Sequence, residues 1–228
     1  MPNCSPVSLI IPVLDEASTI DTLLDSLTQQ GARDVVIVDG GSRDATRVKA
    51  QQWGVRVLSS APGRAQQMNH GARQSAGDYL LFLHADTRLP NDALASIHTA
   101  LTSGRYWGRF DVRIDGQHPL LPVIATAMNR RSRLTGIATG DQGIFMIREV
   151  FEKVGGFPEQ PLLEDIEMSK RLRQLSRPAC LKKRVVTSGR RWERNGVWST
   201  VWLMWRLRYR YWRGVPAERL ATAYSHVR

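Results

Sequence analysis

Acidic side chains follow several of the apolar, β-rich runs of this sequence. Asp15 and Glu16 come after the first run, Asp39 directly follows the second, and Asp86 follows the fourth. If the runs are parallel strands, their carboxyl ends meet at one edge of a sheet, which is where ligands of open α/β sheets bind. Carboxylates there can accept hydrogen bonds from a ligand or hold a divalent cation. For Asp39 and Asp86 we therefore favour a binding site over a solvated loop or a helix cap.

A further carboxylate, Asp165, lies at the start of a predicted helix. Asp165, Met168 and Leu172 share the i, i+3, i+7 spacing of one helical face, so the carboxylate is expected on the inward, apolar stripe. A carboxylate that faces the interior at a helix N-terminus can abstract a proton, and the helix dipole helps to keep it ionised. Favourable N-terminal charge is the alternative, and it explains Glu164 and Glu167 well. For Asp165 we favour catalysis.

Elements that alternate along the chain must position these groups. The apolar runs predict strands at 7–13, 35–38, 55–58 and 79–83, separated by helices at 20–27, 44–53, 65–76 and 91–101, the last with Asn91 as its N-cap. Alternating strands and helices indicate a mostly parallel α/β sheet flanked by helices. After residue 105 we expect strands at 109–114, 143–147 and 180–187 and helices at 119–134, 164–175 and 195–212.

The composition is that of a globular chain with an unusual distribution of charge. The 228 residues are 42% hydrophobic and carry a net charge of +11. Residues 171–228 hold 15 Lys and Arg against 2 Asp and Glu, so the rest of the chain is close to neutral. A uniformly basic nucleic-acid binder is therefore disfavoured, and a domain that docks a cationic segment on an anionic surface is favoured.

The sequence also bears on the cellular compartment. The apolar stretch 7–14 is short, follows no basic region and contains Pro12, so we expect no signal peptide. The uncharged stretch 195–205 is too short to span a bilayer. Cys4 and Cys180 lie far apart and have no metal-ligand spacing, which suits inert thiols in a reducing compartment. We expect a cytoplasmic protein that associates peripherally with the inner face of the cell membrane.

Several short motifs occur in one order along residues 7–175. They are Pro-Val-Leu-Asp-Glu (12–16), Val-Asp-Gly-Gly-Ser-Arg-Asp (38–44), Gly-Arg-Ala (63–65), Asn-His-Gly (69–71), Leu-His-Ala-Asp (83–86), Gly-Gly-Phe-Pro-Glu (155–159) and Glu-Asp (164–165). In this order they resemble the family 2 glycosyltransferases, and most closely a small, non-processive bacterial type with His-Ala-Asp at the metal motif. The resemblance implies the GT-A (Rossmann-like) fold and transfer of a sugar from a nucleotide diphosphate sugar with inversion at the anomeric carbon.

The resemblance assigns donor-binding roles in the first half of the chain. Asp39 matches the carboxylate that accepts a hydrogen bond from the donor nucleobase, and one imide N–H makes uracil the expected base. Arg64 is expected near the ribose or diphosphate, where a permanent cation stabilises the charge of the leaving group. The other donor-binding residues implied by the motifs are Pro12, Asp15, Glu16, Ser42 and Asn69.

The metal motif departs from the family pattern. Asp86 matches the last acid of the D-x-D motif, which implies a divalent cation, Mn²⁺ or Mg²⁺, bridging the diphosphate oxygens. His84 stands where the family usually has aspartate, and imidazole suits Mn²⁺ better than Mg²⁺. A hydrogen-bonded, buried histidine is a slightly better explanation of His84 than a metal ligand.

The remaining assignments concern the acceptor side. The resemblance makes Asp165, paired with Glu164, the general base that takes the proton of the acceptor hydroxyl. Asp141 and Gln142 contact the acceptor or the donor sugar, or else form a turn. Arg191 and Trp192 are similar to the Q-x-x-R-W element of processive members and would reach the donor, or else they form a basic surface patch. Ser188 replaces the glutamine of that element, which favours transfer of a single sugar.

The last predicted helix has its own pattern. One face carries Trp198, Val201, Trp202, Trp205, Tyr209 and Trp212, and arginines lie on or near the opposite face. This is typical of a helix lying in a membrane interface, and packing of the aromatic face on the catalytic domain is the alternative. We expect residues 1–104 to bind the nucleotide sugar, 105–190 to bind the acceptor and supply the base, and 191–228 to form a basic amphipathic helical segment.

The expected partners are a nucleotide-sugar donor, a hydroxyl acceptor that is small or lipid-linked, and an anionic membrane surface, but no nucleic acid. The first alternative is a catalytically degenerate protein that binds a nucleotide or a membrane surface, which the substitution at His84 leaves open. A nucleotidyltransferase is the second, and it would need a glycine-rich, cationic loop after the first strand, where 12–16 lies instead.

Overall fold

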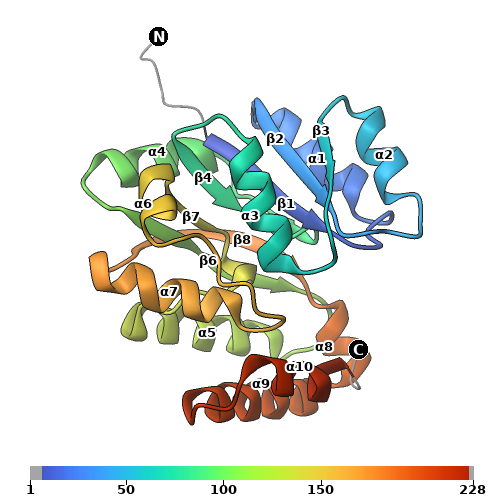
Figure 1. Ribbon diagram of the computed structural model, residues 1–228. Helices are drawn as coiled ribbons and strands as arrows, with labels where there is room; N and C mark the ends of the chain where they lie inside the picture. The colour runs from blue at the N-terminus through green and yellow to red at the C-terminus, as the bar shows by residue number, and fades with distance from the viewer. Residues whose placement is uncertain (1–6, 226–228) are drawn as a thin grey trace.

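The computed structural model describes residues 7–225 as one eight-stranded sheet with helices on both faces (Figure 1). The sheet order is β3-β2-β1-β4-β7-β6-β8-β5. The strands are β1 (Val7–Val13), β2 (Asp34–Asp39), β3 (Arg56–Ser59), β4 (Tyr79–Phe82), β5 (Thr87–Arg88), β6 (Trp107–Asp115), β7 (Ile144–Ile147) and β8 (Ala179–Ser188). The helices are α1 (Ile20–Gln29), α2 (Thr46–Gln52), α3 (Arg64–Gln74), α4 (Ala93–Thr102), α5 (Leu121–Thr135), the short 3₁₀ helix η1 (Gly140–Gln142), α6 (Arg148–Lys153), α7 (Glu164–Leu175), α8 (Arg190–Asn195), α9 (Val197–Trp212) and α10 (Ala217–Ser225).

The first four strands form the parallel half of the sheet. β1 pairs in parallel with both β2 and β4, and β2 pairs in parallel with β3. β1 and β2 are buried on both faces, which is why they read as unbroken apolar runs in the sequence. Their shared direction brings Val13 level with Asp39, so the loops after β1 and β2 emerge at one edge.

The second half of the sheet reverses direction. β7 runs antiparallel to β4 and to β6, while β8 runs parallel to β6 with a register shift between Phe110 and Asp111. Gly108 permits close pairing of β6 with β8, because a Cβ there would lie 2.5 Å from the carbonyl oxygen of Ala179. The sheet therefore continues through both halves of the chain, and β7 begins beside the carboxyl end of β4.

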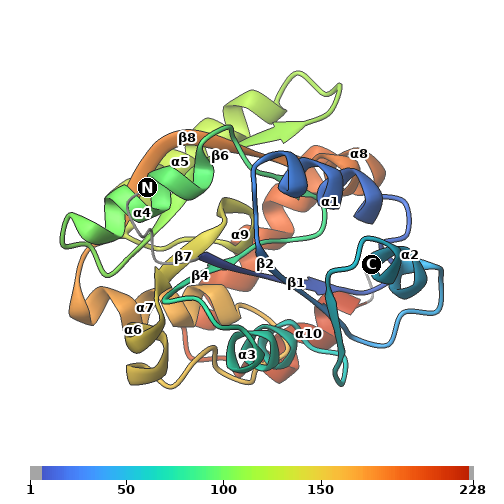
Figure 2. The same cartoon turned by 90° about the horizontal axis from the view of Figure 1, so that it is seen from above.

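Apolar side chains fill both faces of the sheet. One cluster packs α1, α4 and α5 against one face, and a second packs α3, α6 and α7 against the other. Figure 2 shows α3 and α10 on the same side of the sheet, away from α4 and α5. A third, smaller cluster joins α7 to the C-terminal helices through Leu163, Ile166, Leu207 and Leu220.

The predicted parallel α/β core is confirmed, and several details of the prediction are wrong. Asn91 is not the N-cap of α4, because that position belongs to Asp92, whose backbone is left-handed. The single helix predicted at 195–212 is interrupted at Gly196, where φ is +79°, so α8 and α9 are separate. The sequence analysis missed β5, α6 and α10, all short or weakly periodic elements. Cys180 is a half-buried free thiol, and Cys4 lies outside the described residues.

The C-terminal helices form the lower layer in Figure 1. α9 packs inward through Val197, Thr200 and Leu207. Its aromatic face points outward, and the side chains are between 59% and 75% exposed for Trp198, Trp202, Trp205, Tyr209 and Trp212. The alternative in which these aromatics pack on the catalytic domain is therefore wrong. No helix within residues 7–225 has the length and apolar character needed to cross a bilayer.

Candidate active site

A cleft of about 520 Å³ opens at the carboxyl ends of β1 and β4. Its walls come from four parts of the chain: the loop after β1, the start of α3, the loop after β4, and the segment before α7. Helix α10 contributes a fifth wall through Ala221 and Tyr224. Of the predicted site residues, the cleft is lined by Pro12, Glu16, Arg64, His84, Asp86 and Glu164.

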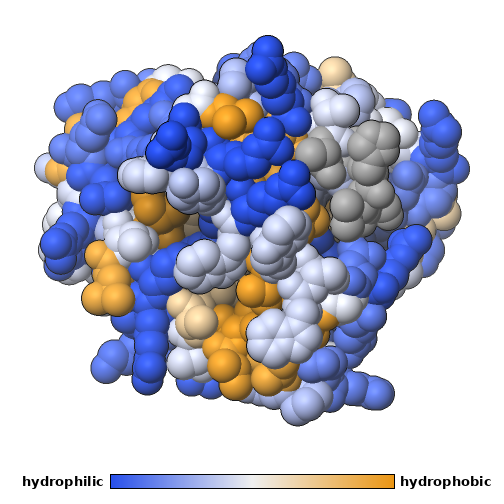
Figure 3. Space-filling model, turned by 90° about the horizontal axis from the view of Figure 1, so that it is seen from below, coloured by the Kyte–Doolittle hydropathy of each residue, from blue (hydrophilic) through white to orange (hydrophobic). Residues whose placement is uncertain are grey.

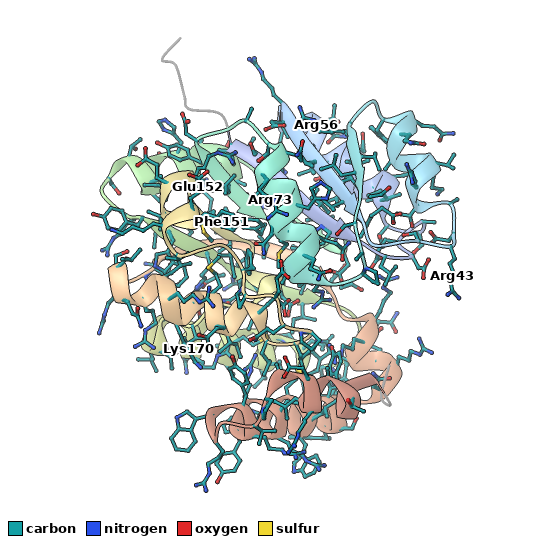
Figure 4. All side chains as sticks on the ribbon, viewed as in Figure 1. Arg43, Arg56, Arg73, Phe151, Glu152 and Lys170 are labelled. Carbon is teal, nitrogen blue, oxygen red and sulfur yellow. The ribbon has the colours of Figure 1, made fainter. Side chains whose placement is uncertain are left out.

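Hydrogen bonds join the loops after β1 and β2. Asp39 is 4% exposed and accepts hydrogen bonds from the backbone N–H and the hydroxyl of Ser42, at 3.1 and 2.5 Å. Asp15, held at φ +56°, donates its N–H to Ser42 and accepts the N–H of Arg43. The Arg43 side chain itself points outward (Figure 4). Asp15 and Ser42 therefore set the shape of the loop around the buried Asp39 carboxylate.

Arg64 is the first residue of α3, directly after Gly63 at φ +148°. Its side chain is exposed in the open cleft. Desolvation opposes its charge, but Glu164, Asp141 and Asp165 outweigh that effect and raise the pKa of Arg64. The structure thus places a permanent cation near the carboxylates at the start of α7. Arg64 lies at the N-terminus of α3, where no side chain caps the helix.

Asp165 is a half-buried carboxylate whose ordinary pKa of 3.8 is raised to about 6. Desolvation is the main cause, and the charges of Glu164 and Asp141 add to it, while hydrogen bonds from the N–H groups of Gly140 and Ile166 oppose it. The Gly140 N–H lies 2.9 Å from Oδ2. A carboxylate with such a pKa is a competent base at neutral pH, because it is mostly ionised and still accepts a proton readily.

The backbone before Asp165 is held in an unusual conformation. Leu163 is left-handed, at φ +65°, which is rare for a bulky residue and marks a position that its surroundings hold in place. Leu163 and Ile166 are buried against Leu207 of α9 and Leu220 of α10. The two C-terminal helices therefore stabilise the turn that aims Asp165.

His84 contacts the residues of η1. Its Nδ1 lies 3.3 Å from Oδ1 of Asp141, and its ring packs so closely on Gly140 that a Cβ there would lie 2.5 Å from Cε1. Desolvation would raise the pKa of Asp141, but the hydrogen bond and charge of His84 outweigh it and lower that pKa. η1 thus links the loop after β4 to Asp165, because Asp141 contacts His84 and Gly140 donates its N–H to Asp165.

The residues fit a cation held mainly by a bound diphosphate. Asp86 lines the cleft, and its carboxylate has only a long contact, 3.3 Å, from the Thr87 hydroxyl. Both edges of the His84 ring face η1, which matches the hydrogen-bonded alternative for this residue. Residues 7–225 contain no cluster of three or more His, Cys, Asp or Glu side chains that could hold a metal. Both predicted metal ligands, Asp86 and His84, line the cleft, and Nδ1 of His84 is engaged by Asp141.

Three predicted site residues make contacts in other parts of the structure, outside the cleft. Asn69 is buried and exchanges two hydrogen bonds of 2.8 Å with the backbone of Phe157. Gln142 is fully buried and closes a capping box with Thr139 at the start of η1. Trp192 packs against the core cluster on the α1 side of the sheet. The structure does not bring these three side chains into the cleft.

Residues of the C-terminal segment reach the site. The Arg191 guanidinium lies 4.6 Å from the ring centre of Tyr224, and its charge also lowers the pKa of Asp141. Arg190 lies 3.3 Å from Glu16, which lines the cleft. The sequence analysis missed Tyr224 and Ala221, because α10 is a short helix whose amphipathic pattern carries no chemical motif.

Comparison with curated proteins gives matches over part of the chain. The chain is 37% identical over 100 residues to a "PGL/p-HBAD biosynthesis glycosyltransferase" of Mycobacterium bovis, covering 40% of this chain and 39% of that protein. It is 30% identical over 97 residues to a glucosyl-3-phosphoglycerate synthase of Mycolicibacterium paratuberculosis, covering 37% of this chain and 30% of that protein. The aligned segment spans less than half the length of either relative.

Solved structures share the fold over most of the chain. A mannosyltransferase of Pyrobaculum calidifontis in complex with GDP-Man and Mn²⁺ superposes with a TM-score of 0.62 at 21% identity, covering 81% of this chain and 57% of that chain. Glucosyl-3-phosphoglycerate synthase of Mycobacterium tuberculosis with Mg²⁺ and UDP gives 0.60 at 18%, covering 80% and 70%. S. aureus TarS with UDP-GlcNAc gives 0.66 at 17%, covering 80% and 58%. The expected GT-A fold is confirmed. The profile of "Glycosyl transferase family 2" matches residues 8–155, more than half of the sequence, and the chain therefore belongs to that family.

Proposed function

We propose that the protein is an inverting glycosyltransferase that moves one sugar from a nucleotide diphosphate sugar to an acceptor hydroxyl, with Asp165 as general base. The observation that carries the proposal is Asp165, whose pKa is raised to about 6 and which follows Glu164, a residue that lines the cleft together with the cation Arg64. Sugar transfer requires the nucleophile to lose a proton and develops negative charge on the leaving group. A base at the site can accept the proton, and a cation can stabilise the negative charge.

The proposed step is a single displacement. The acceptor oxygen attacks the anomeric carbon, the bond from that carbon to the phosphate oxygen breaks, and the hydroxyl proton passes to Oδ1 or Oδ2 of Asp165. The nucleoside diphosphate leaves with the bonding electrons, and Arg64 stabilises its charge. A Mg²⁺ or Mn²⁺ ion, when bound to Asp86 and the diphosphate, would supply further charge neutralisation.

For the donor we propose a uracil nucleotide. The Asp39 carboxylate is buried at the end of β2 and keeps acceptor capacity beyond its bonds to Ser42, which suits one imide N–H. Neighbouring structures contain UDP, UDP-GlcNAc or GDP-Man, so the fold accepts more than one base. The acceptor is proposed to be a small or lipid-like alcohol that enters beside Asp165.

A panel of nucleotide sugars tests the proposal. We expect one UDP-sugar to bind more tightly with Mn²⁺ than without it and to be hydrolysed slowly in the absence of an acceptor. Arg64→Gln should lower that hydrolysis by about 10²-fold, because it removes a charge that acts on the leaving group. Isothermal titration measures binding, and release of UDP measures turnover.

Arg73→Gln is the matched control, since Arg73 lies in the last turn of the same helix, far along α3 from the cleft. If the donor binds but no acceptor or condition yields turnover, the degenerate nucleotide-binding alternative is correct. If no nucleotide sugar binds at all, the proposed function is wrong.

We also propose that α9 docks the enzyme on an anionic membrane surface. Five aromatic side chains of α9 are exposed, and Arg206 stacks on Trp202 at 5.1 Å. Seen from below, this side of the molecule shows apolar and near-neutral side chains bordered by strongly hydrophilic ones (Figure 3). Exposed aromatic side chains next to arginines match a lipid interface, where rings enter the headgroup region and cations meet anionic lipids. Arg190 and Arg191 continue this basic segment up to the cleft.

Vesicle sedimentation tests the docking. Wild type should bind vesicles containing phosphatidylglycerol, lose binding as salt rises, and bind phosphatidylcholine vesicles weakly. Trp202→Ala with Trp205→Ala should reduce binding at least tenfold. Trp53→Ala is the control and should bind like wild type, because Trp53 lies directly after α2, where its indole N–H donates to Asp21. Equal loss in both variants would show that α9 does not dock on lipid, and equal binding to both lipids would show that the surface need not be anionic, which also contradicts the proposal.

A further inference from the structure

A second cavity, of about 290 Å³, lies away from the active-site cleft. It is formed where the carboxyl ends of α5 and α7 meet the loop before β6 and the start of β8. Within residues 7–225, the two cavities share no lining residue. Glu164 lines the cleft at the start of α7, and Arg173 lines the second cavity nine residues later, about 14 Å along the helix. The second cavity is therefore a separate place on the molecule.

The second cavity is lined by arginines, and we call it the arginine cavity. The four are Arg105, Arg133, Arg173 and Arg177. The other lining residues are uncharged, so within the described part of the chain no carboxylate faces the cavity: Leu134, Thr135, Gly136, Pro178 and Cys180. Like charges gathered around a small volume repel one another, and an anion that enters replaces this repulsion with attraction.

Three of the four arginines have donors to spare. Within residues 7–225, the side chains of Arg105, Arg173 and Arg177 are exposed and have no ion pair or hydrogen bond. Favourable charge at a helix C-terminus is the structural alternative, and it suits Arg173 in the last turn of α7. It does not explain Arg105 and Arg177, which lie outside the helices. The elements thus bring together cations that the fold itself does not use.

Arg133 is the fixed cation of the arginine cavity. It donates to Asp111 at 2.6 Å and to the carbonyl oxygen of Cys180 at 3.2 Å. The Asp111 carboxylate is shared with the fully buried Arg109, so one negative charge serves two guanidinium groups. This part of the wall therefore keeps a net positive charge as well.

A glycine lets the ends of α5 and α7 meet at the arginine cavity. Gly136 ends α5 at φ +67°, and its N–H donates to the carbonyl oxygen of Ser132 at 2.8 Å. A Cβ at Gly136 would lie 3.0 Å from Cδ of Arg173, so the chain after α5 passes directly over the aliphatic part of that side chain. The Arg173 side chain is therefore held against the wall of the cavity that it lines.

We propose that the arginine cavity binds a phosphate group or a similar multiply charged oxyanion. The inference goes beyond the proposed function and does not depend on it. Guanidinium forks are suited to two-point contact with phosphate oxygens. The volume lies at the lower end of the range for small-molecule pockets, about 300–1,000 Å³, which suits a phosphate or diphosphate better than a whole nucleotide sugar. A free phosphate compound and a phospholipid headgroup offer the same chemistry, and the experiment distinguishes them.

Calorimetric titration of the full chain with pyrophosphate tests the proposal. EDTA is present, so that no divalent cation holds the pyrophosphate at the active site. We expect wild type to bind it, and Arg173→Gln with Arg177→Gln to bind it more than about tenfold more weakly, because two charge-assisted contacts are lost. Arg105→Gln should also weaken binding, which a role at the end of α7 does not predict. Failure of wild type to bind pyrophosphate would overturn the proposal.

The matched control is Arg73→Gln with Arg130→Gln. Both arginines are exposed outside the arginine cavity, and Arg73 lies in the last turn of α3 as Arg173 does in α7. The control removes the same total charge and should bind pyrophosphate within about twofold of wild type, because screening by salt weakens the effect of distant charges. Equal weakening in both double variants would show unspecific attraction to a basic protein and would overturn the proposal.

Thermal melting separates binding from a structural role. Pyrophosphate should raise the melting temperature of wild type and of the control, but not that of Arg173→Gln with Arg177→Gln. If that variant melts lower than wild type while its affinity for pyrophosphate is unchanged, the arginines only stabilise the end of α7, and the proposal is wrong.

Cys180 reports where the pyrophosphate binds, since its half-buried thiol lines the arginine cavity. With Cys4→Ser in every protein tested, pyrophosphate should slow the reaction of Cys180 with a maleimide. Arg64→Gln, in the active-site cleft, should leave the affinity within about twofold, because the two sites lie at opposite ends of α7. Unchanged labelling of Cys180 together with loss of affinity in Arg64→Gln would place the pyrophosphate in the cleft and overturn the proposal.

Vesicles containing phosphatidic acid identify the source of the phosphate. They are sedimented with protein carrying Trp202→Ala and Trp205→Ala, which removes docking through α9. Sedimentation that is lost with Arg173→Gln and Arg177→Gln supports the site with a lipid headgroup as its ligand. Binding of pyrophosphate without such sedimentation supports the site with a free phosphate compound as its ligand.

Discussion

Asp165→Asn is expected to lower turnover by about 10²–10⁴-fold while the affinity for the donor stays within about twofold. The amide keeps the shape of the carboxylate, and its oxygen can accept the N–H of Gly140, 2.9 Å from Oδ2 in wild type, while the hydrogen bond from the N–H of Ile166 is lost. The variant can no longer take a proton from the acceptor. Donor titration and steady-state release of UDP separate the two effects.

Glu167→Gln is the control for this substitution. Glu167 lies in the first turn of the same helix, where it pairs with Lys170 and accepts a hydrogen bond from Tyr211. Its loss should leave turnover within about threefold, since its carboxylate is engaged by Lys170 and Tyr211 rather than by η1. Equal losses in both variants would mean that charge at the helix start matters in general, and Asp165 would not be the base.

The raised pKa of Asp165 also predicts the pH dependence of wild type. Because a general base must be ionised, kcat/KM should fall about tenfold per pH unit below pH 6 and level off above about pH 7. The effect on stability has the opposite direction. The folded protein holds this proton more tightly than the unfolded chain, so the contribution of Asp165 is most favourable below pH 4 and is lost as the pH rises through 6. At about 1.4 kcal/mol per pKa unit, the change is at most about 3 kcal/mol.

Melting experiments therefore provide a second readout of the same group. Asp165→Asn should melt higher than wild type near neutral pH and lose this advantage near pH 4, as expected where function is retained at a cost in stability. A variant that melts lower than wild type at every pH would contradict the raised pKa.

Gly140→Ala is expected to lower turnover by about 10–10²-fold and leave the fold intact. A Cβ at this position would lie 2.5 Å from Cε1 of His84 and closer still to Nε2. Relief of that contact must move either the imidazole or η1, and η1 carries both the N–H that binds Asp165 and the Asp141 carboxylate that binds His84. A shift of about 1 Å in such groups is enough to cost this much rate. Release of UDP at saturating donor measures the effect.

Gly155→Ala controls for the general effect of changing a glycine. Gly155 has φ +78° with no atom within 4 Å of its added Cβ, so alanine there costs only backbone strain, about 1 kcal/mol of stability, and should leave turnover unchanged. If Gly140→Ala behaves in the same way, the contact between η1 and His84 has no role in the reaction.

For the C-terminal segment, the sequence pattern predicted the helix but not which of its faces is buried. The spacing of its aromatics predicted a helix with one aromatic face, and the direction of that face was open between the catalytic domain and a membrane interface. In the structure the inward face is the one with Leu207, while Trp202 and its neighbours are exposed. Helical periodicity identifies residues that share a face, but it does not say which other element covers that face.

The sequence by itself determined the parallel core and the acidic edge. Strands that are buried on both faces read as apolar runs, and the residues after them, Asp39 and Asp86 among them, must emerge at the same edge because the strands are parallel. Asp165 was placed on an inward face by helical spacing alone. These inferences depend on local periodicity, which a single sequence contains in full.

Only the tertiary structure decided which polar groups are free to act. Asn69 and Gln142 have the right chemistry, yet hydrogen bonds with Phe157 and Thr139 occupy them. Tyr224 of α10 lines the cleft together with residues near the start of the chain, and two buried nitrogens of Arg131, Nε and Nη2, have no hydrogen-bond partner among the described residues. Whether a donor or acceptor is already paired depends on contacts between residues distant in sequence. Those contacts arise from packing of the whole chain, and no local pattern records them.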